Sequence, residues 1–425
     1  MKEQLLHFIW QNKLFNIHEL KTSDGLPVTI LDFGRLNKDA GPDFSNAKIK
    51  IGEILFVGNI EIHVHASDWK KHQHSTDRKY DNVILHVVFF NDWDMSEIPT
   101  LELNGKIPRT LLNKFELLMH SNLALPCKHL EATIQSITLD KWKERLLIER
   151  LERKSEDIIN HLQTNNNDWE QTCYQLIGKY FGSHINKDPF EMLTKTIDYK
   201  ILVKNQNDIQ QIEAILFGVA GFLNKDFVDN YPRDLKKEFE FLKQKYALTC
   251  LQEHQWNFLR IRPISFPTIR LSWFAQLMQQ MPLFQKMIDT KNPISIFENI
   301  EVSDYWNQHY IFDKWSKNKT KNLGDSFKAI LVINVVVPLL FAYGKYTNDE
   351  NYIENAIDLL YHTKEEQNAL LQKFDASIWS RKSAFDTQAL LELDTNYCSK
   401  LRCLDCAVGC SILSFNNPAV FENIA

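Results

Sequence analysis

The sequence predicts an α+β protein that is mostly α-helical, with an N-terminal mixed-sheet α/β domain followed by a large all-helical domain. Short β-type runs separated by turn residues occupy the chain before about residue 120. Nearly every later segment has the hydrophobic period of an amphipathic helix. This change of period divides the chain into an α/β domain, residues 1–120, and a helical domain, residues 121–425, which ends in a cysteine cluster.

The N-terminal domain is expected to open with a helix at residues 3–12, where the apolar side chains share one face. Alternation of apolar residues with lysines predicts a half-buried strand at residues 46–51. Residues 82–90 are almost wholly apolar, as in a central strand covered on both faces. Strands are therefore expected at residues 26–33, 46–51, 54–65 and 82–90, and a helix at residues 106–121.

The composition is that of an ordinary soluble globular protein. The 425 residues are 44% hydrophobic and 24% charged, and a chain of this length suits two or three domains. The formal net charge is −5, so the chain lacks the long-range positive field of a strongly basic protein that binds nucleic acid. Any binding of nucleic acid must therefore depend on local basic patches.

The sequence predicts a cytoplasmic protein without a membrane segment. Its first residues lack the uninterrupted apolar stretch of a signal peptide. The longest apolar run, residues 329–344, contains Asn334 and Pro338 and is shorter than the ~20 residues that span a bilayer, which predicts a buried helix. The chain has seven cysteines, and an odd number without an export signal favours reduced thiols.

Histidines and carboxylates are concentrated between residues 43 and 86. Side chains at positions i and i+2 of a strand share a face, so we expect Glu61, His63 and His65 to point the same way. His86 belongs to the next predicted strand and can reach the same site. A histidine inside an apolar strand is costly unless its ring nitrogens are satisfied, and a metal ion or a carboxylate would satisfy them. The alternative is that these are ordinary core or surface histidines.

A polar loop between the same two strands holds two more histidines, His72 and His74. Lys70, Lys71 and Arg78 lie in the same loop, which indicates a solvated segment. We therefore expect both histidines to support the site from outside, to face a substrate, or simply to be solvated.

Asp43 is a further carboxylate that can take part. It follows Gly41-Pro42 at the start of a hairpin whose second strand carries Glu61, so both carboxylates can face one cleft. Hard cations such as Mg²⁺ and Mn²⁺ prefer oxygen ligands, and Mn²⁺ and Zn²⁺ also accept imidazole. The pattern predicts a divalent metal ion, Mg²⁺ or Mn²⁺. Its predicted ligands are Asp43, Glu61, His63, His65 and His86.

Pro42-Asp43, followed across the hairpin by Glu61-Ile62-His63, resembles the motif of the PD-(D/E)xK phosphodiesterase superfamily. In that superfamily the motif spans a hairpin, with its Asp and Glu binding the metal and its Lys assisting the nucleophilic water. The predicted order of helix, three strands, connection and further strand also resembles that fold. The resemblance implies that Asp43 and Glu61 bind the metal, and His63 stands where the superfamily has lysine.

Nearly the whole chain also resembles an uncharacterised bacterial family, a domain of unknown function. This resemblance implies no activity, but it supports the unity of the chain and the centrality of the matching segments. These are Gly41-Pro42-Asp43-Phe44, Asn46-Ala47, Glu61-Ile62-His63, Ser67-Asp68-Trp69, His72-x-His74, residues 80–88, Phe266-Pro267-Thr268-x-Arg270 and the terminal cysteine segment.

These patterns predict a metal-dependent phosphodiesterase, similar to a nuclease, that attacks nucleic acid with a metal-activated water. Asp43, Glu61 and His63 are its predicted catalytic residues. One alternative is a catalytically inactive nuclease-fold scaffold or binding module that recognises a partner protein. The other is a metallohydrolase that acts on a small molecule.

A second group of residues suited to metal binding lies near the end of the sequence. Cys398, Cys403, Cys406 and Cys410 have the spacing Cys-x4-Cys-x2-Cys-x3-Cys. Where thiols are reduced, such density favours a metal over disulfides, and thiolates suit Zn²⁺ or an iron–sulfur cluster. The last three cysteines also have helical spacing, so thiols packed on a terminal helix are the alternative.

Overall fold

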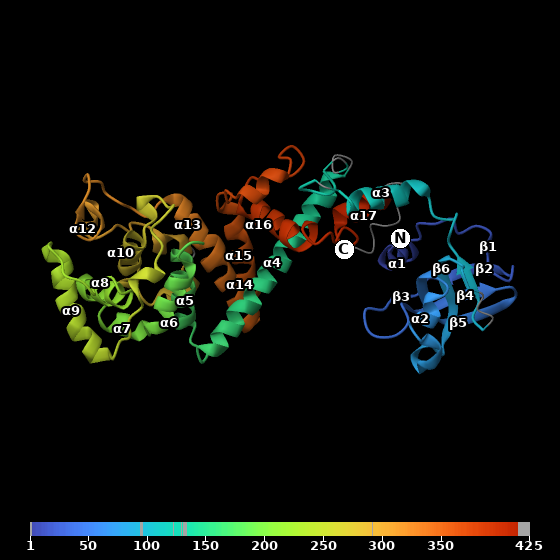
Figure 1. Cartoon of the computed structure of the whole chain (residues 1–425), viewed down its shortest axis with the longest axis horizontal. Helices are drawn as coiled ribbons and strands as arrows, with labels where there is room; N and C mark the ends of the chain where they lie inside the picture. Colours follow the sequence, from blue (N-terminus) through green and yellow to red (C-terminus); the bar gives the residue numbers. More distant parts are fainter. Residues whose placement is uncertain are drawn as a thin grey trace. The chain divides into compact units, whose positions relative to one another are not determined.

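A computed structural model of the chain describes residues 2–93, 97–121, 123–128, 130, 134–290 and 292–414. The chain forms two compact units, coloured by position in the sequence in Figure 1. The first unit comprises residues 1–143, 372–379 and 392–425, and the second comprises residues 144–371 and 380–391. The sequence predicted that everything after residue 120 belongs to the helical domain. In the structure, the chain returns to the first unit at residues 372–379 and again after residue 391, where its last helix, α17 Ala407–Ser414, packs on α3 Arg109–Met119.

The first unit contains the mixed sheet that the sequence predicted. Its strands follow the order β1-β2-β4-β5-β6-β7, with β3 paired to β4. Strands β2, β4 and β5 are antiparallel neighbours, whereas β6 runs parallel to β5, and β7 runs parallel to β6. The strands are β1 Leu20–Lys21, β2 Pro27–Asp32, β3 Arg35–Leu36, β4 Phe44–Ile51, β5 Ile54–His65, β6 Val83–Phe90 and β7 Thr100–Glu102.

The two central strands are buried on both faces where they pair. Helix α1, Glu3–Gln11, packs against β5 (Figure 1). Four consecutive residues of β5, from Ile60 to His63, are buried, and so is most of β6. Polar side chains on this part of β5 therefore lie inside the unit and must be satisfied there.

The rest of the first unit is helical. Short segments connect β5 to β6: α2 Asp68–Lys71 and the 3₁₀ turns η1 His74–Thr76 and η2 Arg78–Tyr80. Helix α3, Arg109–Met119, packs on α17, Ala407–Ser414, although almost 300 residues separate them (Figure 1). Lys114 Nζ donates a hydrogen bond to the Ile412 carbonyl oxygen at 3.1 Å, which ties the two helices together.

The second unit is almost wholly helical, as predicted. Helix α4, Ser136–Thr164, begins in the first unit and continues into the second. A short hairpin is formed by β8 His309–Ile311 and β9 Lys314–Trp315. The remaining helices are α5 Trp169–Phe181, α6 Lys187–Thr196, α7 Tyr199–Lys204, α8 Ile209–Val219, α9 Asn230–Tyr246, α10 Pro267–Met278, α11 Leu283–Asp289, α12 Asp304–Asn307, α13 Asp325–Leu331, α14 Val337–Thr347, α15 Glu350–His362 and α16 Ala384–Leu393.

The long apolar run forms a core helix. Helix α13, a π-helical segment Val332–Val336 and α14 follow one another without a break from Asp325 to Thr347. By length and composition alone this stretch could cross a membrane, but 67% of its most apolar window is buried inside the protein. The predicted buried helix is thus confirmed, and the structure is consistent with a soluble protein.

One carboxyl group is buried in the middle of the helical unit. Glu213 on α8 accepts hydrogen bonds from the Tyr231 hydroxyl at 2.8 Å, the Ser272 hydroxyl at 3.0 Å and the Ser303 hydroxyl at 2.7 Å. Burial raises its pKa from 4.5 to about 7, although these three hydrogen bonds act in the opposite direction. The native state therefore holds a proton that the unfolded chain releases between pH 4.5 and about 7.

Glu213→Gln is expected to reduce the loss of stability that accompanies rising pH. With a raised native pKa, the stabilising contribution of Glu213 is complete below pH 4.5 and is lost as the pH rises through about 7. Between pH 5 and pH 8, the free energy of unfolding should fall by roughly 2–3 kcal/mol less in the variant than in the wild type. Urea unfolding of both proteins at pH 5 and pH 8 measures it, with Glu240→Gln, an exposed position on α9, as the control. An equal change in the free energy of unfolding between pH 5 and pH 8, in Glu213→Gln and in the wild type, would contradict the raised pKa of Glu213.

Candidate metal centre

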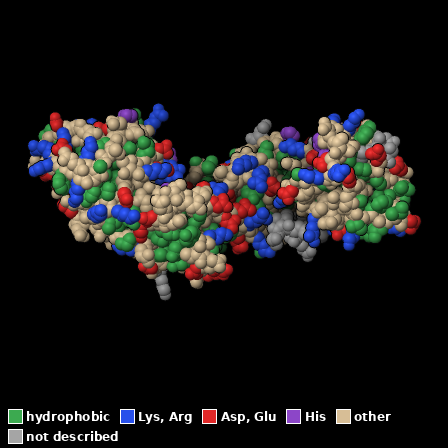
Figure 2. Space-filling view, turned by 90° about the horizontal axis from the view of Figure 1, so that it is seen from below, with side chains coloured by type: hydrophobic (Ala, Val, Ile, Leu, Met, Phe, Trp, Pro, Cys, Tyr) green, Lys and Arg blue, Asp and Glu red, His purple; other side chains and the backbone are tan. Residues whose placement is uncertain are grey.

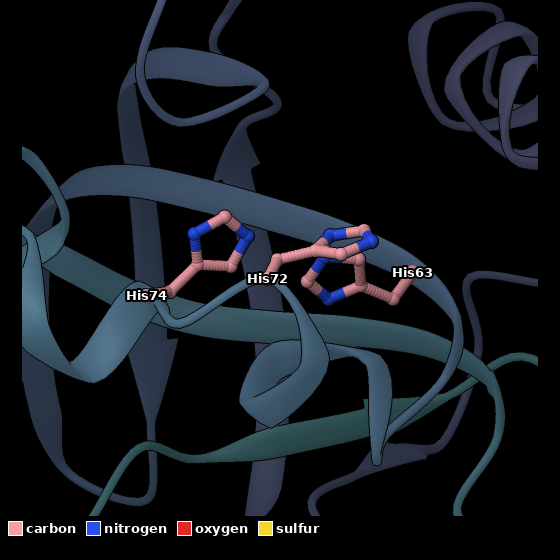
Figure 3. A group of neighbouring side chains, drawn as sticks. All are labelled: His63, His72 and His74. Atoms are coloured by element: carbon pink, nitrogen blue, oxygen red, sulfur yellow. The ribbon is translucent and has the colours of Figure 1, made fainter.

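Three histidine rings gather beside the central strands (Figure 3). His63 comes from β5, His72 from the C-terminal end of α2, and His74 from the start of η1. One ring nitrogen from each lies within 4.8 Å of the other two. This spacing lets one ion contact all three histidines.

The backbone explains how the two loop histidines reach His63. Strand alternation turns the side chains of Glu61 and His63 to the same face of β5. After β5 the chain folds back through α2, which packs on that strand. Gln73 has a left-handed conformation, with φ 59°, and reverses the chain between His72 and His74. As a result, both imidazole rings face His63.

Contacts between donor atoms define the centre. His63 Nε2 lies 3.1 Å from His72 Nδ1 and 3.5 Å from Glu61 Oε1. The same Glu61 oxygen lies 3.2 Å from His74 Nε2. Three imidazole nitrogens and one carboxylate oxygen therefore stand next to one another, which is the donor set of a transition-metal site.

The burial of these groups tests whether an ion suits the site. His63 is 1% exposed and His86 is 0% exposed. Within the described part of the chain, buried His86 Nδ1 has no hydrogen-bond partner, and buried His74 Nε2 lies near Glu61 Oε1 without forming a hydrogen bond to it. Unsatisfied polar atoms in an interior are costly. A cation beside His74 would engage one of them, so the residues fit a metal.

The protonation states also fit a cation. Burial, followed by the charge of Asp43, raises the pKa of Glu61 to about 9, so this carboxyl holds a proton at pH 7, and a cation bound beside it would lower that pKa and favour the carboxylate. Burial, followed by the charges of the neighbouring histidines, lowers the pKa of His63 to about 2. Burial and the charge of His74 lower that of His86 to about 4. The imidazoles are therefore neutral at pH 7, which is the form that binds metals.

Three further side chains enclose the centre. His86 Nε2 lies 2.9 Å from His63 Nδ1, a contact that holds the His63 ring with its other nitrogen toward His72. Trp69 is buried and its ring centre lies 5.2 Å from those of both His74 and His86. Tyr80 stacks on His74 at 3.8 Å. These rings exclude water from one side of the site.

Asp43 lies beside Glu61, bonded to the backbone of β5. Its carboxylate accepts a hydrogen bond from the Ile62 N–H at 2.9 Å and lies 3.2 Å from His7 Nε2. Its own N–H donates to Glu61 Oε2 at 3.1 Å. Asp43 thus positions the Glu61 carboxylate. His7, on α1, was not singled out from the sequence, where nothing in its helix indicated a partner in β5.

His65 has partners of its own at the end of β5. His65 Nδ1 lies 3.5 Å from Asp92 Oδ2, and the ring stacks on Phe90 with a centre-to-centre distance of 5.6 Å. The structure therefore brings Glu61, His63, His86 and Asp43 together, and gives His65 contacts outside the group of three histidines.

The sequence and fold described above match a known family. A family model described as a protein of unknown function, DUF2851, matches residues 3–369. The chain belongs to the DUF2851 family. Comparisons with curated proteins and with solved structures find no match. The DUF2851 match includes the whole mixed sheet and every histidine of the centre, and it ends before Cys398.

Two histidines of this candidate centre were placed outside it by sequence reasoning. His72 and His74 were interpreted as supporting the site from outside, facing a substrate, or solvated, because their loop is polar. The His-x-His spacing was the signal that could have identified them, since two histidines two residues apart are a common pair of metal ligands. Periodicity gave no indication of the left-handed turn that brings both rings to one side.

The four cysteines beyond the DUF2851 match surround a tight turn. Cys398 ends a π-helical segment, Asp394–Cys398, and Cys410 lies in α17. Cys403 and Cys406 lie in the turn between these elements and are buried, as is Cys410. All four belong to the first unit, together with the histidine centre.

Proposed function

We propose that this protein is a metal-dependent hydrolase, with a divalent cation held by His63, His72 and His74, and that it cleaves phosphodiesters. The observation that carries the proposal is the convergence of three imidazole nitrogens beside the buried carboxylate of Glu61. This arrangement matches the catalytic type of metal site, in which three protein ligands leave a position for water or substrate.

The donor atoms favour zinc or manganese over magnesium. Imidazole nitrogen suits Zn²⁺ and other transition metals, whereas Mg²⁺ prefers a shell of oxygens. The prediction of Mg²⁺ from the sequence assumed that two carboxylates, those of Asp43 and Glu61, bind the ion directly. In the structure, the Asp43 carboxylate instead contacts the Ile62 N–H and His7. When bound, a cation would lower the pKa of a coordinated water and stabilise charge on the phosphate.

Residues of the chain supply the remaining chemistry. Glu61 Oε1 points at the histidine nitrogens, and once a bound cation had lowered its pKa, the Glu61 carboxylate would take the proton of the attacking water. Asp43 fixes the other Glu61 oxygen through its N–H. His86 orients His63, and Trp69 and Tyr80 limit the access of water to one side.

The surroundings of the loop histidines favour an anionic substrate. Lys70 and Lys71 precede His72, and Arg78 and Lys79 follow His74, all four exposed. Such groups recognise phosphate through charge and hydrogen bonds. Figure 2 shows Lys and Arg interspersed with Asp and Glu on the face in view, in agreement with a net charge of −5. Binding of nucleic acid would therefore depend on this local basic segment.

The order of elements supports a phosphodiesterase of the PD-(D/E)xK kind. Helix α1, the antiparallel strands β2, β4 and β5, a short helical connection and the parallel strand β6 follow the order described for that superfamily. Asp43 directly precedes β4, Glu61 lies on the adjacent strand β5, and His63 stands where the superfamily has lysine. The histidine centre accounts for this replacement, since His63 acts as a ligand.

Glu61→Gln is expected to lower kcat/KM for phosphodiester hydrolysis by on the order of 100-fold, because the amide cannot accept the proton of water. Wild type and variant are loaded with Zn²⁺ or Mn²⁺ and assayed with bis(p-nitrophenyl) phosphate, single- and double-stranded DNA, and RNA. Glu53→Gln, in the exposed β4–β5 turn, is the matched control and should retain activity. Absence of hydrolysis of all four substrates by metal-loaded wild type would refute the proposal.

A small-molecule metallohydrolase is the second candidate. His63 and His86 are fully buried and aromatic rings cover one side of the centre, which favours a small substrate over a rigid duplex. Hydrolysis of the small diester without cleavage of DNA or RNA would select this candidate. Binding of metal without any hydrolysis would select the inactive scaffold.

A further inference from the structure

The C-terminal ends of β5 and β6 carry an exposed pair of rings, His65 and Phe90. The two residues are neighbours in the parallel register of the strands. Their rings stack with centres 5.6 Å apart and an interplanar angle of 23°. The side chain of His65 is 45% exposed, and Phe90 is 40% exposed. An aromatic pair that stays this exposed at the end of two buried strands is accessible to a ligand.

The strands on either side end before they reach this pair. Strand β4 begins at Phe44, opposite Ile60, so it does not extend alongside His65. On the other side, β7 pairs with β6 only as far as Val88 and Glu102. Within the described part of the chain, therefore, no strand flanks the last residue pair of β5 and β6. This difference in strand length leaves the two rings partly open to solvent.

The stacked pair shares a face of the sheet with the histidine centre. Side chains alternate along a strand, so Glu61, His63 and His65 point to one side of β5. The register pairs His86 with Glu61 and Phe90 with His65, which places both β6 side chains on that same face. His65 lies two residues beyond His63, or about 6.6 Å along the strand. This distance is close to that between a phosphate and the base of its own nucleotide.

Hydrogen bonds hold the His65 end of the pair in place. Asp92 Oδ2 accepts a hydrogen bond from the Ser67 hydroxyl at 2.8 Å and lies 3.5 Å from His65 Nδ1. The backbone N–H of His65 donates to Asp68 Oδ2 at 3.1 Å. A ring that is fixed before binding loses little conformational entropy when a ligand stacks on it. The pair is therefore a preorganised stacking surface.

Basic residues beside the pair supply charge for phosphate groups. Lys70 and Lys71 lie on α2, which packs on β5 and begins shortly after His65. Lys71 Nζ lies 2.6 Å from Asp68 Oδ1, whereas Lys70 is exposed and makes no ion pair with a described residue. Sites for single-stranded nucleic acid combine positive charge along the backbone with aromatic rings on which the bases stack. Both components are present here.

We propose that Phe90 and His65 stack on a base of single-stranded nucleic acid whose phosphate lies at the histidine centre. The inference rests on the proposed phosphodiesterase function and names its substrate class. A single strand is favoured because the bases of a duplex are already stacked on one another. Every base has a π-face, so the ring pair is expected to bind bases with little preference for sequence.

Binding of single-stranded DNA tests the ring pair separately from hydrolysis. Fluorescence anisotropy compares oligothymidylate with an abasic chain of equal length and charge, in EDTA and again with zinc-loaded Glu61→Gln. Wild type in EDTA and the zinc-loaded protein should both bind oligothymidylate about tenfold more tightly, the effect expected of one stacked base. Phe90→Ala should bind both chains equally, and Phe90→Trp, which keeps an aromatic face, should retain the preference.

Phe241→Ala is the matched control, because Phe241 is a 60% exposed phenylalanine on α9 in the second unit. It should keep the preference of the wild type. The proposal is overturned by equal affinity of wild type for the two chains, by no binding of either, by tighter binding of a duplex, or by a retained preference in Phe90→Ala. A preference for bases without hydrolysis of any substrate would support the ring pair and refute the hydrolase.

A measurement on the wild type covers the case in which Phe90→Ala does not fold. A single-stranded oligonucleotide that carries iodouracil is bound in EDTA and irradiated, and the cross-linked residue is identified by mass spectrometry. A base stacked on the ring pair should cross-link to Phe90 or His65. Cross-links to other residues alone would overturn the proposal.

Discussion

His72→Ala is expected to weaken the binding of Zn²⁺ by on the order of 100-fold or more, equivalent to about 2.7 kcal/mol. His72 supplies one of three converging nitrogens, and its Nδ1 lies 3.1 Å from His63 Nε2. The side chain of His72 is exposed, so its removal leaves the core of the unit intact. Titration calorimetry with zinc, at fixed pH, measures the loss of affinity directly.

The same substitution should abolish stabilisation by zinc. A ligand that binds only the native state at 100 times its dissociation constant adds about 2.7 kcal/mol to the free energy of unfolding. The free energy of unfolding of the wild type should rise by this amount in zinc, and EDTA should reverse the rise. His65→Ala is the matched control, because His65 is a partly exposed histidine of the same segment with contacts to Asp92 and Phe90. An equal loss of affinity in both variants would show that the ion binds elsewhere.

Gly409→Ala should destabilise the first unit by about 3 kcal/mol, the upper end of the cost of overpacking. The added methyl group would meet the backbone of Cys403 at 2.1 Å, and only a shift of the turn or of α17 could relieve it. Because α17 packs on α3, such a shift also disturbs the helix that precedes Cys127.

Denaturant unfolding, followed by a probe in the first unit, measures this effect. Gly324→Ala is the control, since a Cβ atom there meets nothing within 4 Å and its φ of −71° suits any residue. The control should change stability by less than about 0.5 kcal/mol. Equal stability of Gly409→Ala and wild type would show that the turn does not depend on this close approach.

Local sequence patterns were sufficient to predict the mixed sheet and the helical region. Alternation of Ala47, Ile49 and Ile51 with lysines identified β4, and the continuous apolar run identified β6 as a buried central strand. The same alternation indicated that Glu61 and His63 share a face, which the structure shows at a separation of 3.5 Å. These features were accessible because the side-chain period of a strand depends on neighbouring residues alone.

The sequence by itself thus determined the mixed sheet, the helical region and the strand that carries Glu61 and His63. Only the tertiary structure decided that His72 and His74 join His63, that His7 meets Asp43, and that α3 packs on α17. The path of a loop and the packing of distant helices depend on contacts between residues far apart in the chain. Such contacts leave no period in the sequence, so periodicity identified the strand that carries Glu61 and His63 but not the histidines that join them from the loop.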